Sequence, residues 1–254
     1  MAFGFRATSA LILGCFACAS TARAAHPLQT EDTGTQGVGN FELENGLTWS
    51  RTGSARDFIY QPQVSYGLTP TVDLLGQPSW ISHRDESGAT SRAAGDTNLD
   101  AKWRFFGSAP LSLALRAGLT LATSGDGLGN PHGKVAVHGL IATTYDAAPF
   151  TVHANLGLAQ APDDSGQRTP QRTHIATASA AFMWALSEQL ILTVDGSTSS
   201  NPDPQRKSWA GTMLAGAIYT IKPGLDADIG WRSSLGPIAA TRQWLLGLTY
   251  RFAL

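Results

Sequence analysis

The feature that most constrains this chain is a two-residue alternation of apolar and polar side chains, repeated through about twelve short segments. In the last segment, aromatic and leucine side chains occupy the even positions from Trp244 to Phe252, whereas Thr249 and Arg251 lie between them. Apart from Phe106, which we expect at a turn, every aromatic residue after position 25 falls on the apolar side of such an alternation. Successive side chains of a strand face opposite sides, so this spacing gives one aromatic-rich face and one polar face. A soluble sheet hides its apolar face in a core, whereas a transmembrane barrel turns that face to lipid.

The first 24 residues have the composition of a cleaved signal peptide. Arg6 precedes a largely apolar stretch over residues 7–19, and Ala22-Arg23-Ala24 fits a small-x-small cleavage site that leaves Ala25 as the mature terminus. Lipoprotein processing at Cys15 is an alternative. Cys15 and Cys18 both lie within the leader, so we expect an exported chain without a disulfide or a cysteine-based metal site.

Composition narrows the fold class of the remainder. The formal net charge is −1 and no run of basic residues occurs, so nothing indicates a nucleic-acid partner. No later apolar stretch approaches the roughly 18 residues of a transmembrane helix. Glycine is abundant and helix signals are scarce, so we predict an all-β fold.

The spacing of turn residues predicts a transmembrane antiparallel up-and-down β-barrel of about twelve strands over residues 40–254. The expected strands before the last segment are residues 40–51, 57–67, 71–82, 97–106, 111–123, 134–145, 150–159, 173–186, 190–197, 209–221 and 225–232. After the first hairpin, tight connections alternate with longer polar loops at residues 84–96, 124–133, 160–172, 198–208 and 233–240. Bacterial outer-membrane barrels have this asymmetry, with short periplasmic turns and long external loops. We therefore expect an outer-membrane location with both termini in the periplasm.

Two motifs add a resemblance to known proteins. Gly247, Tyr250 and Phe252 have the Gly-x-x-aromatic-x-aromatic spacing of the sorting signal of outer-membrane barrels, which implies the barrel-assembly machinery as a partner beside outer-membrane lipids. The segment His26-Pro27-Leu28-Gln29-Thr30-Glu31-Asp32-Thr33-Gly34-Thr35-Gln36-Gly37 and the stretch Gly95-Asp96-Thr97-Asn98-Leu99-Asp100-Ala101-Lys102-Trp103-Arg104-Phe105 resemble a family of proteobacterial outer-membrane proteins. That family is described as the transporter of a phenol-degradation (meta-cleavage) pathway, and the resemblance implies uptake of small aromatic or hydrophobic solutes.

We find no pattern that predicts catalysis. The chain has neither a Gly-x-Ser-x-Gly elbow nor a His-Glu-x-x-His helix, so we expect no catalytic residues, no cofactor and no enzyme activity. His138 and His153 share the polar face of one predicted hairpin, but they are too far apart along the strands to bind one metal ion, and we predict no metal site. Ser82 and His174 fall on strands across the predicted barrel, too far apart for a dyad.

The polar face of the strands predicts a charged lumen. The candidate lining residues are Glu42, Glu44, Asp73, Asp100, Lys102, Arg104, Arg116, His138, His153, Asp195, Asp226, Asp228, Arg232, Arg242 and Arg251. These groups could form a salt-bridge network that fills a closed, structural barrel, or they could line a passive pathway for small solutes. The polar stretch over residues 25–39 is expected to remain in the periplasm or to fold into the lumen as a plug. A third reading, a secreted soluble barrel that binds ligand, requires the aromatic face to point inward.

Overall fold

The computed structural model describes residues 26–124, 134–160, 172–201, 203–236 and 239–253. The predicted leader lies outside the described residues, as do most of the predicted loops at 124–133 and 160–172. No helix in the described part of the chain is long and apolar enough to cross a membrane.

Within the described residues, fourteen β-strands follow one another along the chain. They are β1 (Asn40–Thr52), β2 (Ala55–Thr69), β3 (Val72–Gln77), β4 (Trp80–Arg84), β5 (Thr90–Ala94), β6 (Thr97–Ser108), β7 (Leu111–Leu121), β8 (Ala136–Ala147), β9 (Phe150–Gln160), β10 (His174–Ala185), β11 (Leu190–Ser200), β12 (Trp209–Lys222), β13 (Leu225–Leu235) and β14 (Thr241–Ala253).

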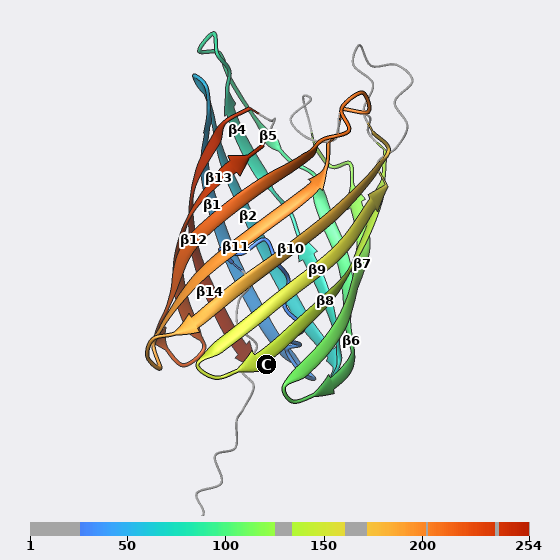
Figure 1. Ribbon diagram of the computed structural model, residues 1–254, viewed down its shortest axis with the longest axis vertical. Coiled ribbons are helices and arrows are strands. Elements are labelled where there is room, and N and C mark those ends of the chain that lie inside the picture. The colour runs from blue at the N-terminus through green and yellow to red at the C-terminus, as the bar shows by residue number, and fades with distance from the viewer. Residues whose placement is uncertain (1–25, 125–133, 161–171, 202, 237–238, 254) are drawn as a thin grey trace, which may run out of the picture.

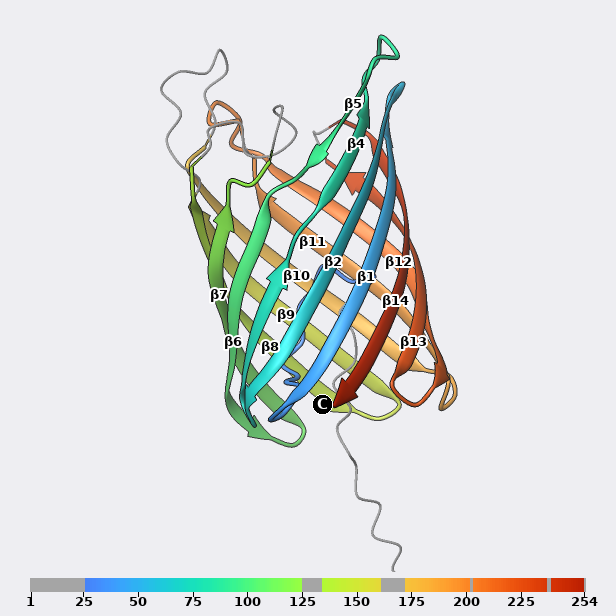
Figure 2. The same ribbon diagram turned by 180° about the vertical axis from the view of Figure 1, so that it is seen from behind.

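All pairings are antiparallel, and the sheet closes because β14 pairs with β1. The turn end of strand β2 pairs with β3 and its other end pairs with β4. On their far sides, β3 pairs with β6, and β4 pairs with β5. Each of the pairs β3–β4 and β5–β6 therefore forms one interrupted wall strand, which leaves a barrel of twelve wall strands. Figures 1 and 2 show these strands tilted around a single closed wall. The predicted barrel fold is confirmed.

The interruption corrects two expected boundaries. Residues 71–82 were expected to form one strand, but the strand breaks at Pro78 and Ser79, where proline cannot supply a backbone N–H to the ladder. The expected loop at residues 84–96 contains β5, so β4 and β5 form a hairpin. The Gly95 N–H donates to the Ser79 carbonyl across the break at 2.9 Å.

The apolar face points away from the interior. All seven tryptophans are exposed, from 40% for Trp49 and Trp231 to 56% for Trp244, whereas Glu42, Asp73 and Lys102 are buried. This arrangement is the reverse of a soluble barrel and matches a barrel whose outer surface meets lipid. The reading as a soluble ligand-binding barrel, which required inward-pointing aromatic side chains, is therefore wrong.

The two ends of the barrel differ. The tight turns and the C-terminal strand end lie together at the lower end in Figure 1, and the β4–β5 hairpin projects from the opposite end. We call these the turn end and the hairpin end.

Candidate functional site

The candidate functional site is the barrel interior, which thirteen of the fifteen lining candidates face; the exceptions are Arg104, at the rim, and Arg242. Arg242 was predicted to line the lumen, but this prediction is wrong: the residue has the same parity as Trp244 and is exposed on the outer face. Its inward-facing neighbour is Gln243, which the side chain of Arg232 contacts at 3.3 Å.

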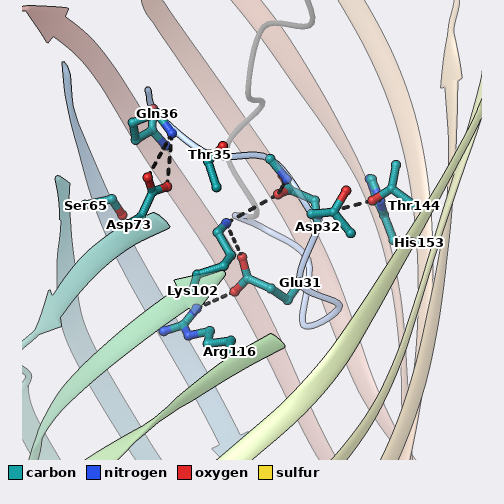
Figure 3. A network of polar contacts seen from close by, with 12 residues as sticks. Glu31, Asp32, Thr35, Gln36, Ser65, Asp73, Lys102, Arg116, Thr144 and His153 are labelled. Atoms are coloured by element: carbon teal, nitrogen blue, oxygen red, sulfur yellow. Dashed lines mark hydrogen bonds and ion pairs between the residues drawn. The ribbon is translucent and has the colours of Figure 1, made fainter. Parts of the chain in front are cut away.

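Residues 26–36 run through this interior, inside the ring of strands (Figure 3). From the start of β1 the segment passes the turn end of β3, crosses to the β7–β9 wall, and then returns along β11–β13 to β1. It thereby contacts inward-facing side chains on opposite walls of the barrel. We call residues 26–36 the lumenal segment.

Glu31 is the centre of the charge network that holds the lumenal segment (Figure 3). One carboxylate oxygen accepts from Lys102 Nζ at 2.9 Å, and the other pairs with Arg116. Arg116 also donates to Asp100 at 2.6 Å, and Asp100 contacts His138 Nε2 at 2.6 Å. Because Lys102 and Glu31 are both buried, each carries a charge that would be costly without its partner.

Two wall residues bind the backbone of the lumenal segment directly. Asp195 is buried on β11 and accepts hydrogen bonds from the backbone N–H groups of Gln29 and Thr30, at 2.6 and 2.9 Å. Asn155 on β9 both accepts from the Glu31 N–H at 2.7 Å and donates to the Glu31 carbonyl at 2.9 Å. The lumenal segment belongs to no strand, so these contacts provide the hydrogen-bond partners that its buried backbone N–H and C=O groups would otherwise lack.

A second ionic group lies toward the turn end. Asp73 accepts from the Gln36 N–H at 3.0 Å, and the Gln36 side chain donates to Glu42 at 2.8 Å. Arg251 bridges Glu42 and Asp226, both at 2.7 Å. Arg104 lies at the rim, where it donates to the Pro70 carbonyl at 3.1 Å.

The first described residue, His26, is held between β1, β13 and β14. Its Nδ1 lies 2.5 Å from Asp228, and its backbone N–H donates to Glu44 at 3.4 Å. Gly247, a residue of the predicted sorting signal, lies beneath this contact, and a Cβ there would overlap both His26 and Asp228. The geometry gives Gly247 a packing role in addition to the predicted sorting role.

One part of the inner wall is apolar. Met183, Ile191 and Ile218 form a buried cluster on β10–β12, and Leu28 of the lumenal segment packs against it. His153 borders this cluster, with Nε2 3.2 Å from Met183 Sδ and Nδ1 2.9 Å from Thr144 Oγ1. We call Met183, Ile191 and Ile218 the inner apolar strip.

Sequence reasoning missed the residues that complete the network, namely Glu31, Gln36 and Asn155. The segment that carries Glu31 shows no alternation, and an asparagine on a polar face has no distinctive spacing. The two adjacent carboxylates Glu31 and Asp32, placed before a wall rich in arginine and lysine, were the one available signal.

Metal binding and a Ser–His dyad have no geometric support within the described residues. No three His, Cys, Asp or Glu side chains of that part of the chain group closely enough to hold a metal ion. Ser82 and His174 lie on β4 and β10, which are not neighbours in the sheet.

Solved structures with a similar fold include outer-membrane channels and porins. No protein-family model matches the chain, and no curated protein matches it. An outer membrane channel from Pseudomonas putida F1 is 13% identical with a TM-score of 0.73, over 87% of this chain and 98% of that chain. The NanC porin is 9% identical with a TM-score of 0.61, over 82% and 98%. The CymD monoaromatic hydrocarbon channel is 7% identical with a TM-score of 0.52, over 86% and 89%. At these identities the likeness establishes the fold, which is that of an outer-membrane β-barrel.

Proposed function

We propose that the protein is a passive outer-membrane channel for small solutes, closed in this conformation by its lumenal segment. The observation that carries the proposal is that every hydrogen bond and ion pair between the described residues 26–36 and the wall involves a side chain, with no backbone–backbone hydrogen bond to a strand. A segment held in this way can leave the lumen without breaking the strand ladder. The proteins of similar fold described above are themselves named as channels and porins.

We propose small aromatic or hydrophobic compounds as the solute class. The inner apolar strip supports this, because departure of Leu28 would uncover Met183, Ile191 and Ile218 inside an otherwise charged lumen. The resemblance to the phenol-degradation family points the same way, and CymD is named as a monoaromatic hydrocarbon channel.

We propose that the turn end faces the periplasm, so that both termini lie there. The support is the asymmetry between tight turns and the projecting β4–β5 hairpin, which in bacterial barrels separates the periplasmic from the external side. Recognition of Tyr250 and Phe252 on β14 by the barrel-assembly machinery follows from the same orientation.

The first experiment is single-channel conductance of the purified protein in a planar bilayer, compared with a variant that lacks residues 26–36. We expect the deletion to raise conductance, and Asp228→Asn to shift it by freeing His26. Glu188→Gln, in the exposed β10–β11 turn, is the matched neutralisation that should change nothing. Equal conductance with and without the lumenal segment would contradict closure by that segment.

A closed barrel with a structural role is the second candidate, favoured by the dense pairing of the buried charges Glu31, Lys102, Arg116 and Asp100. The same recordings separate the two. If the deletion variant is folded, as judged by heat-modifiable gel mobility, and is still silent, the closed barrel is the better description.

A further inference from the structure

A row of arginines crosses the outer face of the barrel near the hairpin end. Arg51 on β1 is directly opposite Arg242 on β14 and Arg56 on β2, and Arg56 is directly opposite Arg84 on β4. Four neighbouring strands thus each place an arginine in one continuous cross-strand register, which runs obliquely around the barrel because the strands are tilted. We call Arg242, Arg51, Arg56 and Arg84 the arginine row.

All four side chains are exposed. They face outward, because each arginine has the same parity as an outward-facing aromatic residue on its own strand. With strands about 4.8 Å apart, the row spans roughly 14 Å perpendicular to the four strands. Like charges directly opposite each other on neighbouring strands repel, so this arrangement is unfavourable unless an anion lies over it.

The described acidic side chains near the row make no ion pair with it, including Glu86, whose carboxylate lies close to Gly53. Among the described residues, none of the four arginines forms an ion pair with an acidic side chain, and Arg51 donates instead to the Gly53 carbonyl at 3.0 Å. Asp57 faces inward, where Ser50 and His83 bind it at 2.9 and 2.5 Å. Asp85, at the hairpin tip, accepts from the Ser87 hydroxyl and the Ala89 N–H.

An aromatic row lies directly below the arginines. Two residues closer to the barrel centre, Trp244, Trp49 and Phe58 are in register on β14, β1 and β2, and Trp231 on β13 continues the row. The rings of Trp49 and Phe58 are 5.3 Å apart. Aromatic girdles mark the interface between acyl chains and headgroups in membrane barrels, so the arginines above them lie at headgroup level.

We propose that the arginine row binds the phosphate groups of a phosphorylated glycolipid in the outer leaflet of the outer membrane. Arginine suits this partner because its planar fork binds phosphate oxygens in pairs, and a row of four could engage a headgroup that carries more than one phosphate. Arg92, exposed and outward on β5 beside Ser82, extends the cationic face at its edge. The proposal rests on the proposed orientation, in which the hairpin end is external.

The test measures lipid binding to the purified protein in an uncharged detergent by native mass spectrometry, with bisphosphorylated lipid A as the probe. We expect the double variant R51Q/R56Q to bind lipid A about tenfold more weakly. The control K207Q/K222Q removes the same charge from exposed sites elsewhere and should bind like the wild type. Because glutamine removes the repulsion between neighbouring arginines at exposed positions, we expect both variants to fold, and heat-modifiable gel mobility checks this. The single variant Arg56→Gln should lose less lipid A binding than the double variant.

Two results would overturn the proposal. One is equal lipid A binding by R51Q/R56Q and the wild type. The other is displacement of lipid A by inorganic phosphate at the same concentration, which would make the row a site for free anions. Neither readout needs an open lumen, so a silent channel in bilayer recordings leaves this test intact.

Orientation is tested separately with Ser87→Cys at the hairpin tip. A membrane-impermeant maleimide should label this cysteine on intact cells. Labelling only after the outer membrane is disrupted would place the arginine row in the inner leaflet and overturn the assignment to the glycolipid.

Discussion

Glu31 is the residue on which attachment of the lumenal segment most depends. Replacing it with glutamine keeps the shape but removes the charge, which leaves Lys102 with Asp32 at 3.5 Å as its remaining ionic contact. Breaking a buried ion pair costs about 3–5 kcal/mol. The segment can leave the lumen, so we expect E31Q to favour the undocked state, with higher conductance and a lower thermal unfolding midpoint. Glu188→Gln is the exposed control, and unchanged conductance and midpoint in E31Q would contradict this role.

Gly67 contacts the chain just after the lumenal segment, where residues 37–39 lead into β1, so a substitution there tests how closely this part of the chain fits against the wall. The Gly39 N–H donates to the Gly67 carbonyl at 2.9 Å, and a Cβ at Gly67 would overlap the backbone of Gly37. We expect G67A to push residues 37–39 away from β2 and to cost about 1–3 kcal/mol of stability, as overpacking does. Limited proteolysis of the N-terminal region should become faster. Gly196→Ala is the matched control, since a Cβ there meets nothing within 4 Å, and equal proteolysis of both variants would count against the close fit.

The lumenal segment as an element is held to β7 by Thr33, whose hydroxyl lies 2.5 Å from that of Ser112. In a chain with Cys15 and Cys18 changed to serine, we expect the pair T33C/S112C to form a disulfide that locks the segment in place. Oxidised protein should conduct less than reduced protein, and adding a reducing agent to the oxidised protein should restore its conductance. The single-cysteine variants should not respond. An oxidised protein that still opens would show that closure does not depend on this contact.

At the scale of elements, the alternation predicted the wall well, because lipid on one side and a polar interior on the other impose the two-residue period on every strand. It could not predict the break at Pro78, where the wall strand resumes as β4 with the same outward parity at Trp80. It also could not place β5, whose sequence of small and polar residues has no apolar face.

The lumenal segment was beyond prediction in detail for a related reason. It has no period, and its position follows from long-range partners such as Asp195 and Asn155, which are more than a hundred residues away along the chain. A plug was one of two expectations for residues 25–39, and its effect on conductance stays a prediction. Arg242 was predicted to face the lumen together with Thr249 and Arg251, but its position has the parity of Trp244 and so faces outward.

For the whole molecule, the distribution of tryptophan separates a lipid-facing barrel from every soluble alternative. All seven tryptophans are exposed on the outer face. Trp49, Trp231 and Trp244 lie near the hairpin end, and Trp184 lies near the turn end. Bromine on lipid acyl chains quenches indole fluorescence on contact, whereas aqueous iodide reaches only rings in water. We therefore expect protein reconstituted in brominated lipid to lose most of its tryptophan fluorescence, and iodide to have little effect.

The control for this measurement is the same protein unfolded in urea beside the same vesicles, where iodide should quench and brominated lipid should not. The membrane-facing assignment fails if the folded, reconstituted protein responds to iodide and ignores brominated lipid. Changing Trp103→Phe, which removes the ring at 52% exposure on β6, should lower the lipid-quenched signal by its share without altering gel mobility. The tryptophans lie on the outer face of the wall and the lumenal segment lies inside it, so this result does not depend on whether residues 26–36 close the channel. It tests contact between the outer face and lipid, which is the physical cause of the two-residue alternation.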